Sequence, residues 1–393
     1  MPLNPPVFSF HQPVRLIFGE GSFSRIGEVV RSVHGSHALI ITDPGILEAG
    51  FPQLAGQILS DQGMRVSFFS EVIENPTTET VAACAAVARS ERIDTLIGLG
   101  GGSSIDTAKG CNFILTNGGR IEDYCGYGKA THPFLPMIAI PTTAGTGSEC
   151  QSYALISDAA THRKMACGDP RAIPSAAILD PCLTVTQPPL VTACTGIDAI
   201  AHAVESFVTQ RRTPLSSLFA REAFHLMAES FGQVLHEPNH LEARGRVLLG
   251  AAYAGIAIEN SMLGAAHAAA NPLTARYGIT HGQAVGVMLP EVVRYNAMEA
   301  HAGELYLQLI EESGINGGSL QDKGNPGECL AAWLETILAQ GGLPGNMRDL
   351  GVQADNLPQL AQMAAEQWTG TFNPRPMNAE LFRQLYEQVM EKS

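Results

Sequence analysis

The sequence GLGGGSSIDTAKG, residues 98–110, decides the fold of the first half of this 393-residue chain. It follows the apolar run Asp94–Gly98 and leads into a helical segment, so it predicts a strand, a glycine turn and a helix in direct succession. Glycine lets the backbone approach a ligand closely, and the free N–H groups at a helix start bind phosphate without any net positive charge. We therefore expect a diphosphate-binding turn here, with a plain tight turn as the alternative.

This glycine turn differs from the two commonest phosphate-binding fingerprints. Ser103 stands where the third glycine of GxGxxG belongs, and the Gly-Lys-Ser/Thr of a P-loop is absent. Asp106 and Lys109 fall on the first turns of the expected helix, where they either face the ligand or form an ordinary salt bridge with each other.

Short β-branched runs alternate with helical segments across the first half of the chain. The expected strands are near 14–18, 37–43, 65–69, 94–98, 136–140 and 177–180, and the expected helices are near 22–33, near 47–62 and after residue 78. Such alternation predicts a Rossmann-like α/β domain, in which helices cover both faces of a parallel sheet.

The composition and periodicity of the sequence change after the last expected strand. Prolines punctuate residues 181–189, and the chain then becomes rich in Ala and Leu with helical period. We place the boundary after residue 184 and expect an all-α domain over 185–393, without strands. Its expected helices are near 190–208, 214–233, 241–258, 262–270, 282–296, 299–313, 327–340, 357–367 and 378–391.

A second turn, PTTAGTGSE at residues 141–149, also follows an expected strand. Its hydroxyl groups, on Thr142, Thr143 and Thr146 among others, suit the sugar and phosphate oxygens of the same ligand. In open α/β sheets, ligands lie beyond the carboxyl ends of the strands. Asp43 stands at such an end, where a carboxylate accepts hydrogen bonds from both ribose hydroxyls of an adenosine and repels a 2'-phosphate. This favours NAD over NADP, with an ordinary turn acid as the alternative.

The stretch GIDAIAHAVES, residues 196–206, places Asp198 and His202 four residues apart in an apolar segment. A helix brings both side chains to one face, although such pairs also arise by chance. His267 and His281 favour a metal site over a chance pair, because both stand in sequences rich in Ala, Leu and Gly, where a histidine without a function is unexpected. One carboxylate and three imidazoles suit Fe(II) or Zn(II) and leave positions open for a substrate oxygen.

The two later histidines belong to different helices. Pro272 and Gly278 lie between His267 and His281, so one unbroken helix cannot carry both. We expect His267 on a helix and His281 at the entry to the next one.

Composition restricts the classes of partner and compartment. The formal net charge of -14, without any Lys/Arg cluster, argues against a nucleic-acid or anionic-membrane partner, and no apolar tract is long enough to span a bilayer. The N-terminal MPLNPP lacks a basic region followed by an apolar one, and the eight cysteines are scattered without a CxxC. We therefore expect reduced thiols and a cytoplasmic protein.

Several motifs, in this order, make the chain similar over essentially its whole length to the iron-containing (group III) alcohol dehydrogenase family. They are Phe18-Gly-x-Gly21, Asn75-Pro76, Gly100-Gly-Gly-Ser103 with Asp106 and Lys109, Pro141 to Glu149, Asp198-Ala-x-x-His202-Ala-x-Glu205, His267, His281-Gly282 and Asn373-Pro-Arg375. The resemblance implies a nucleotide-binding α/β domain, a helical metal domain in the architecture of dehydroquinate synthase, an active site in the cleft between them, and a homodimer.

The resemblance also assigns residues to roles. The metal ligands, which act in catalysis through the metal, are Asp198, His202, His267 and His281. The positions that match cofactor contacts are Asp43, Asn75, Gly101, Gly102, Ser103, Asp106, Thr142, Thr143, Thr146 and Lys164.

One departure from the family bears on mechanism. Many members carry a further histidine four residues after the third ligand, thought to help relay a proton, whereas this chain has Asn271, which cannot titrate. Proton exchange then uses water, the cofactor ribose or another group, or the substrate preference differs. Tyr153, Ile258 and Trp368 are similar in position to family residues that face the substrate, although core packing is the alternative for Ile258.

These patterns together predict a metal-dependent, NAD(H)-linked alcohol dehydrogenase or aldehyde reductase that acts on a small alcohol or aldehyde. Alternatives within the oxidoreductases are a glycerol-dehydrogenase-like zinc enzyme and a metal-free maleylacetate reductase. A dehydroquinate-synthase-like lyase needs a basic pocket for a phosphorylated substrate, and the metal-domain segments contain little Lys or Arg. A catalytically silent scaffold does not need the four-ligand set.

Overall fold

The computed structural model describes residues 7–161, 163–315 and 325–392, which form two compact units. The first unit runs from Gln12 to Gln187, and the second contains residues 7–11 and the chain from Pro188 onward. This division falls three residues after the predicted boundary at 184. The attachment of residues 7–11 is not predicted by the sequence; it depends on contacts such as the ring of Phe10 stacked 5.8 Å from that of Phe219.

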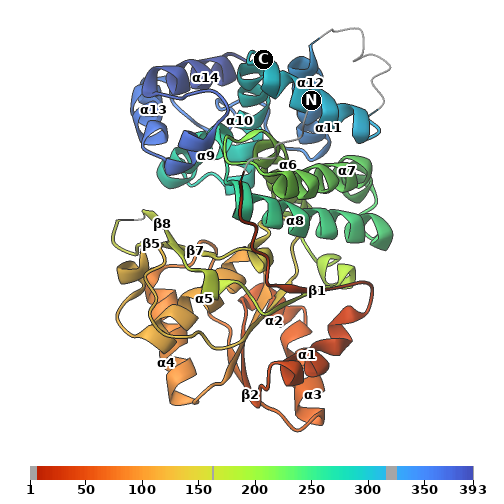
Figure 1. The fold of residues 1–393 in the computed structure, drawn as a ribbon, viewed down its shortest axis with the longest axis vertical. Helices are drawn as coiled ribbons and strands as arrows, with labels where there is room; N and C mark the ends of the chain where they lie inside the picture. Colours follow the sequence, from red (N-terminus) through yellow and green to blue (C-terminus); the bar gives the residue numbers. More distant parts are fainter. Residues whose placement is uncertain (1–6, 162, 316–324, 393) are drawn as a thin grey trace. The chain divides into compact units, whose positions relative to one another are not determined.

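A six-stranded sheet lies at the centre of the first unit (Figure 1). Its strands are β1 (Arg15–Phe18), β2 (His37–Ile41), β3 (Arg65–Phe69), β4 (Thr95–Gly100), β6 (Met137–Pro141) and β9 (Ala176–Leu179), in the spatial order β1-β9-β6-β4-β2-β3. Every neighbouring pair is parallel. Strands β2, β4 and β6 are buried along their whole length, which explains their continuous apolar sequences. The predicted Rossmann-like parallel sheet is confirmed.

Helices cover both faces of this sheet. Alternate residues of a strand point to opposite faces, so Leu39 and Ile41 of β2 join one hydrophobic core and Ile40 joins the other. The first core lies under α4 (Thr78–Ser90) and α5 (Gly102–Asn117), and the second lies under α1 (Ile26–Ser32) and α3 (Phe51–Asp61). The doubly wound arrangement follows from these two cores.

The first unit differs from the sequence prediction in two places. The single helix expected near 47–62 is two helices, α2 (Pro44–Glu48) and α3, because Gly50 adopts a left-handed conformation (φ 84°) between them. A second sheet of three strands was not predicted: β5 (Gly126–Tyr127), β7 (Tyr153–Ser157) and β8 (Lys164–Gly168). Its strands are short and partly exposed, so they lack the continuous apolar runs that mark the central strands.

The second unit is helical and, over residues 188–315 and 325–392, contains no strand, as predicted. Its helices are α6 (Pro189–Val208), α7 (Pro214–His236), α8 (Leu241–Ser261), α9 (Ala265–Tyr277), α10 (His281–Asn296), α11 (Ala300–Glu312), α12 (Pro326–Gln340), α13 (Leu357–Ala365) and α14 (Ala379–Glu391). The expected end near 270 is wrong for α9, which continues through Pro272 and ends where Gly278 takes a left-handed conformation. Pro272 has no backbone N–H and so removes one hydrogen bond from the helix, but the helix continues on both sides of it.

Helix α6 is the central element of the second unit. Nearly all its residues from Thr192 to Val208 are buried, and it packs on α7, α8 and α10. A helix with apolar residues on nearly every side is stable in water only when neighbouring elements cover all its faces. Among the described residues, no single helix is both long and apolar enough to cross a membrane; the bent pair α8 and α9, at 104°, meets that criterion by length and composition only.

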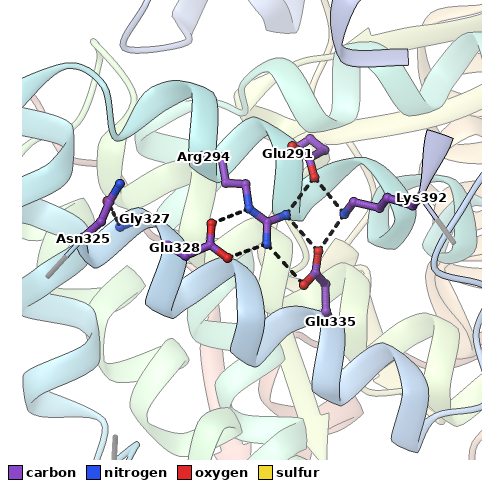
Figure 2. A network of polar contacts seen from close by, with 7 residues as sticks. All are labelled: Glu291, Arg294, Asn325, Gly327, Glu328, Glu335 and Lys392. Carbon is purple, nitrogen blue, oxygen red and sulfur yellow. Dashed lines mark hydrogen bonds and ion pairs between the residues drawn. The ribbon is translucent and has the colours of Figure 1, made fainter. Parts of the chain in front are cut away.

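An ion-pair network joins α10, α12 and the end of the C-terminal helix (Figure 2). Arg294 donates two hydrogen bonds to Glu328, at 2.7 and 2.9 Å, and further bonds to Glu291 and Glu335. Lys392 lies 2.8 Å from Glu291 and 2.7 Å from Glu335. The Glu291 side chain is only 10% exposed, so Arg294 and Lys392, rather than water, must stabilise its negative charge.

We expect the substitution Arg294→Met to lower the free energy of unfolding by about 1–2 kcal/mol, because it leaves Glu291 and Glu335 with Lys392 and removes both hydrogen bonds of Arg294 to Glu328. Thermal melting at low salt should show the loss, and 1 M NaCl should reduce the difference from wild type. Arg276→Met, at an exposed arginine, is the matched control. Equal melting temperatures for all three proteins at low salt would show that the network adds nothing.

Candidate metal centre and nucleotide-binding turn

Three helices of the second unit carry the four predicted metal ligands. Asp198 and His202 lie one turn apart on α6, His267 is the third residue of α9, and His281 is the first residue of α10. The expectation that His281 stands at the entry to its own helix is therefore confirmed. Asp198, His202 and His267 are buried, at 3–5% exposure.

The structure brings these four side chains around one atom. The Nε2 atoms of His202, His267 and His281 lie 3.5, 3.3 and 3.7 Å from Asp198 Oδ1. Among the described residues, Asp198 Oδ1 and His267 Nε2 are buried without a hydrogen-bond partner. Buried polar atoms without partners are rare and costly, and a cation between them accounts for both. The set therefore fits a divalent metal, although metal binding itself stays a prediction.

A close approach between α6 and α10 makes this convergence possible. A Cβ atom on Gly282 would lie 2.1 Å from the carbonyl oxygen of Cys194, which is one turn before Asp198 on α6. Only glycine fits there, so the residue after His281 lets the first turn of α10 touch α6. This contact is the physical reason for the His281-Gly282 pair.

The charges of the centre favour a positive group beside Asp198. Burial opposes the ionisation of Asp198, but the neighbouring imidazoles, His202 first, outweigh burial and hold the pKa of this carboxyl well below its usual range. Burial likewise opposes the protonation of His267, but Glu205 and Asp198 outweigh it and raise the pKa of this imidazole to about 9. Both shifts favour positive charge beside the Asp198 carboxylate.

Glu205 is a member of this centre that the sequence analysis did not assign to the site. Its Oε2 lies 2.5 Å from His267 Nδ1, and its Oε1 accepts a hydrogen bond of 2.7 Å from the backbone N–H of Ala266. A carboxylate on Nδ1 fixes the tautomer so that Nε2 presents its lone pair to the metal. The available signal was its spacing: Glu205 stands seven residues after Asp198, on the same face of an apolar helix.

We expect Glu205→Gln to weaken metal binding about 10- to 100-fold, because an amide replaces the carboxylate that orients His267. Competition with a chromophoric chelator measures this affinity, and Glu311→Gln, at an exposed position on α11, is the control. An unchanged dissociation constant in a folded Glu205→Gln protein would remove Glu205 from the centre.

In the first unit, the glycine turn and the second predicted turn lie against each other. Helix α5 begins at Gly102 with Gly101 as its N-cap, directly after β4. A Cβ atom on Gly102 would lie 2.7 Å from Thr146, and one on Gly101 would lie 3.4 Å from Thr143. The two turns thus form one surface of free backbone N–H groups and hydroxyls, which suits a diphosphate. Thr142, beside them, is buried.

Asp43 lies at the same end of the sheet. It follows β2 and caps α2, because its Oδ1 accepts a hydrogen bond of 3.0 Å from Ile46 N–H. Its Oδ2 lies 3.5 Å from Ser104 Oγ and close to Gly100. The structure therefore places Asp43 beside the glycine turn, and its contact with a ribose stays a prediction.

The remaining predicted cofactor residues have varied surroundings. Ser103 lies in the first turn of α5, Asn75 precedes α4 in a left-handed conformation (φ 53°), and Lys164 begins β8. Asp106 is buried: its Oδ1 accepts a hydrogen bond of 2.5 Å from Ser148 and its Oδ2 accepts one of 3.0 Å from Leu155 N–H. Both oxygens of Asp106 thus bind the chain itself, and cofactor contact by these four residues stays a prediction.

Lys109 shares this internal role. Its buried ammonium group donates to Ser148 O, Ser148 Oγ and Tyr153 O at 2.7 to 2.9 Å and lies 3.8 Å from Asp106. The salt bridge left open by the sequence is therefore present. Together Asp106 and Lys109 attach the threonine-rich turn to α5.

Two family sequence models match the chain, one after the other. The model for iron-containing alcohol dehydrogenase matches residues 13–181, and the model for the C-terminal part of the Fe-containing alcohol dehydrogenase family matches residues 192–390. The chain belongs to the iron-containing alcohol dehydrogenase family. It is thus an oxidoreductase of the iron-containing alcohol dehydrogenase type, a family that implies NAD and a metal.

Relatives of known activity span the whole chain. The 1,3-propanediol dehydrogenase of Klebsiella pneumoniae is 32% identical over 97% of this chain and 99% of its own length. The NAD-dependent methanol dehydrogenase of Bacillus methanolicus is 31% identical over 97% of this chain and 100% of its own. The sulfoacetaldehyde reductase of Bifidobacterium kashiwanohense, solved in complex with NAD+, superposes with a TM-score of 0.89 at 25% identity and covers 99% of this chain and 100% of its own.

Asn271 and the three residues expected to face the substrate, Tyr153, Ile258 and Trp368, differ in exposure and contacts in this family member. Ile258 is buried in α8, in agreement with its alternative role in core packing. Asn271 donates a hydrogen bond of 3.0 Å to Gln367, and Trp368, next along the chain, is 45% exposed. Tyr153, in the other unit, packs its ring 5.6 Å from that of Tyr127. Their contact with substrate stays a prediction.

The threonine-rich turn ends in a buried carboxyl that the sequence did not mark. Burial raises the pKa of Glu149 from 4.5 to about 7, and Lys109 only partly opposes the shift. The folded protein therefore binds this proton more tightly than the unfolded chain does. We therefore expect the ionisation of Glu149 to lower stability by roughly 3 kcal/mol as the pH rises from about 4.5 to 7, with no further loss above 7.

We expect Glu149→Gln to remove this loss, since the amide stays neutral at every pH. Its melting temperature should exceed that of wild type at pH 8 and match it near pH 4.5. Glu71→Gln, at an exposed glutamate, should follow wild type at both values. A Glu149→Gln protein that is no more stable than wild type at pH 8 would contradict the shifted pKa.

Proposed function

We propose that this chain is a metal-dependent dehydrogenase that transfers hydride reversibly between NAD(H) and a small alcohol or aldehyde. The observation that carries the proposal is the convergence of three imidazole nitrogens on the buried Asp198 Oδ1, at 3.3 to 3.7 Å. Membership of the iron-containing alcohol dehydrogenase family supports the same conclusion.

We propose that Asp198, His202, His267 and His281 hold iron(II), with zinc(II) as the alternative that the same donor set accepts. When bound, the metal supplies a Lewis acid, which lowers the pKa of an alcohol hydroxyl or polarises the carbonyl of an aldehyde. By accepting the hydrogen bond of Nδ1–H, Glu205 would leave Nε2 of His267 as the nitrogen directed at the metal and make it a stronger electron-pair donor.

The cofactor is assigned to the first unit. NAD accepts or donates the hydride, and the protein's task is to bind and orient it. The backbone N–H groups of Gly101 and Gly102, at the start of α5, hold the diphosphate, while Thr143 and Thr146 bind its oxygens or those of the ribose. Asp43 accepts hydrogen bonds from the adenosine ribose and repels a 2'-phosphate, which selects NAD.

The substrate is proposed to be small and without strong charge. The helix that carries His267 begins with the sequence AAHAAA, so short apolar side chains flank this ligand along the chain. The relatives act on 1,3-propanediol, methanol and sulfoacetaldehyde by their names, and of these the first two fit an uncharged site. The amide of Asn271 cannot carry a proton, so the proton of the alcohol leaves through water, the cofactor ribose or another group.

We further propose a cytoplasmic homodimer. All eight cysteines are free thiols in the structure, in agreement with a reducing compartment, and the dimer follows from the family resemblance. Light scattering after size-exclusion chromatography measures the mass of the assembly against 41.7 kDa for one chain.

The experiment compares wild type, His267→Ala and the control His236→Ala, which changes an exposed histidine at the end of α7. Protein is purified without air, its metal is measured by elemental analysis, and NADH formation is followed with a panel of short alcohols. We expect about one metal per chain in wild type and in the control, and neither metal nor turnover in His267→Ala. Turnover by metal-free wild type would instead favour the maleylacetate-reductase-like chemistry.

A further inference from the structure

Asn373 is a buried residue whose amide side chain uses all its hydrogen-bonding capacity. Its Oδ1 accepts hydrogen bonds from the N–H of Ala265, at 3.3 Å, and from Asn296 Nδ2, at 3.1 Å. Its Nδ2 donates to Asn296 Oδ1 at 2.7 Å and to Arg375 O at 2.9 Å. Two donors and two accepted bonds leave no vacant position on this amide, so its orientation is fixed.

The backbone around Asn373 is bound as firmly as its side chain. Gln210, two residues after the end of α6, donates from its N–H to Phe372 O at 2.9 Å and from Nε2 to Asn373 O at 2.9 Å. Arg375 donates to Tyr295 O, and its guanidinium carbon lies 3.9 Å from the centre of the Tyr295 ring. One short segment therefore joins the end of α6, the start of α9 and the end of α10.

The start of α9 receives its caps from residues far away in sequence. The N-cap residue Gly264 has no side chain to offer, so the N–H of Ala265 binds Asn373 and the N–H of Ala266 binds Glu205 Oε1 at 2.7 Å. His267 is the next residue, and its Nδ1 binds the other oxygen of Glu205. The first turn of α9 is thus held between a carboxylate on α6 and the amide of Asn373.

We propose that Asn373, with Asn296, is a positioning residue for the metal centre: it fixes the first turn of α9 so that Nε2 of His267 stands beside Asp198. This inference rests on the proposed metal site. The separation of His267 Nε2 and Asp198 Oδ1 is 3.3 Å, and metal–ligand distances tolerate only about 0.2 Å of error. A small shift of α9 changes both bonds of Glu205, and with them the direction of the imidazole lone pair.

Packing alone does not require this arrangement. Two buried amides must satisfy every donor and acceptor to avoid a large desolvation cost, whereas two apolar side chains fill the same space without that condition. Hydrogen bonds fix the orientation of the two amides, and this fixed orientation allows the pair to position the metal ligand His267. Asn373-Pro-Arg375 is also a motif of the sequence for which hydride transfer itself supplies no role.

The test measures cobalt(II) binding to the full chain, stripped of metal, in wild type, Asn373→Ala, Asn296→Ala and the control Asn378→Ala. Asn378 is an exposed asparagine five residues after Asn373 that caps α14, so its loss removes a hydrogen bond and some stability without touching α9. Dissociation constants come from chelator competition at 25 °C, and the visible cobalt spectrum reports ligand geometry. Melting temperatures of the metal-free proteins show which variants are folded at 25 °C.

We expect Asn373→Ala and Asn296→Ala to bind cobalt at least about tenfold more weakly than wild type and with an altered visible spectrum, and Asn378→Ala to match wild type in both. A lost hydrogen bond that affects only global stability moves the melting temperature and leaves both readouts of the folded protein unchanged. Wild-type affinity and spectrum in folded Asn373→Ala would overturn the proposal.

Gly264→Ala tests the same point if Asn373→Ala does not fold. Its added methyl group would lie 3.0 Å from Asn373 Oδ1 and 3.0 Å from Glu205 Oε1, so it displaces the caps without removing them. Gly345→Ala, which adds a methyl group with no atom within 4 Å, is its control. We expect weaker cobalt binding only in Gly264→Ala, and equal affinities would count against the proposal.

His267→Ala separates this inference from the proposed function. If His267→Ala binds cobalt as tightly as wild type, the metal site itself is wrong. If His267→Ala loses cobalt while Asn373→Ala and Gly264→Ala retain wild-type affinity, the metal site stands and only the positioning role of Asn373 fails.

Discussion

A carboxylate oxygen of Asp198, buried among three imidazole nitrogens at 3.3 to 3.7 Å, constrains the whole helical unit. Such an oxygen is costly without positive charge beside it, because burial removes the water that would otherwise solvate it. The three helices that carry the four side chains must therefore be positioned to within a few tenths of an ångström. Gly282 permits the contact of α10 with α6, and Glu205 joins α6 to the start of α9.

The first unit is proposed to bind a diphosphate rather than a metal ion, and it offers different chemical groups for this. A chain of formal net charge -14 is proposed to hold a diphosphate without a basic patch, by presenting backbone N–H groups at the start of α5. Two buried charged residues, Asp106 and Lys109, keep the threonine-rich turn against that helix through Ser148. Charge in this unit thus stabilises the loop that shapes the turn, while the proposed phosphate contacts are made largely by neutral groups.

Local patterns of the sequence predicted most of the architecture. Continuous apolar runs marked β2, β4 and β6 because both faces of these strands are buried, and the spacing of Asp198 and His202 predicted one helical face. The path of α9 through Pro272 and the three-stranded sheet were missed, since tertiary contacts decide both. The spacing of Glu205 from Asp198 puts it on their common helix face, but its partner Ala266 lies 61 residues away, and Asn373 acts on Ala265, 108 residues away, which no local pattern reveals.

Anomalous diffraction at the iron and zinc absorption edges, from crystals of the wild-type chain grown without air, tests the metal centre most directly. We expect one strong peak at about 2.0–2.2 Å from the Asp198 carboxylate and from the Nε2 atoms of His202, His267 and His281. The edge at which the peak appears distinguishes iron from zinc. A map with no peak at these four side chains, from protein that still reduces NAD with an alcohol, would contradict the proposed metal centre.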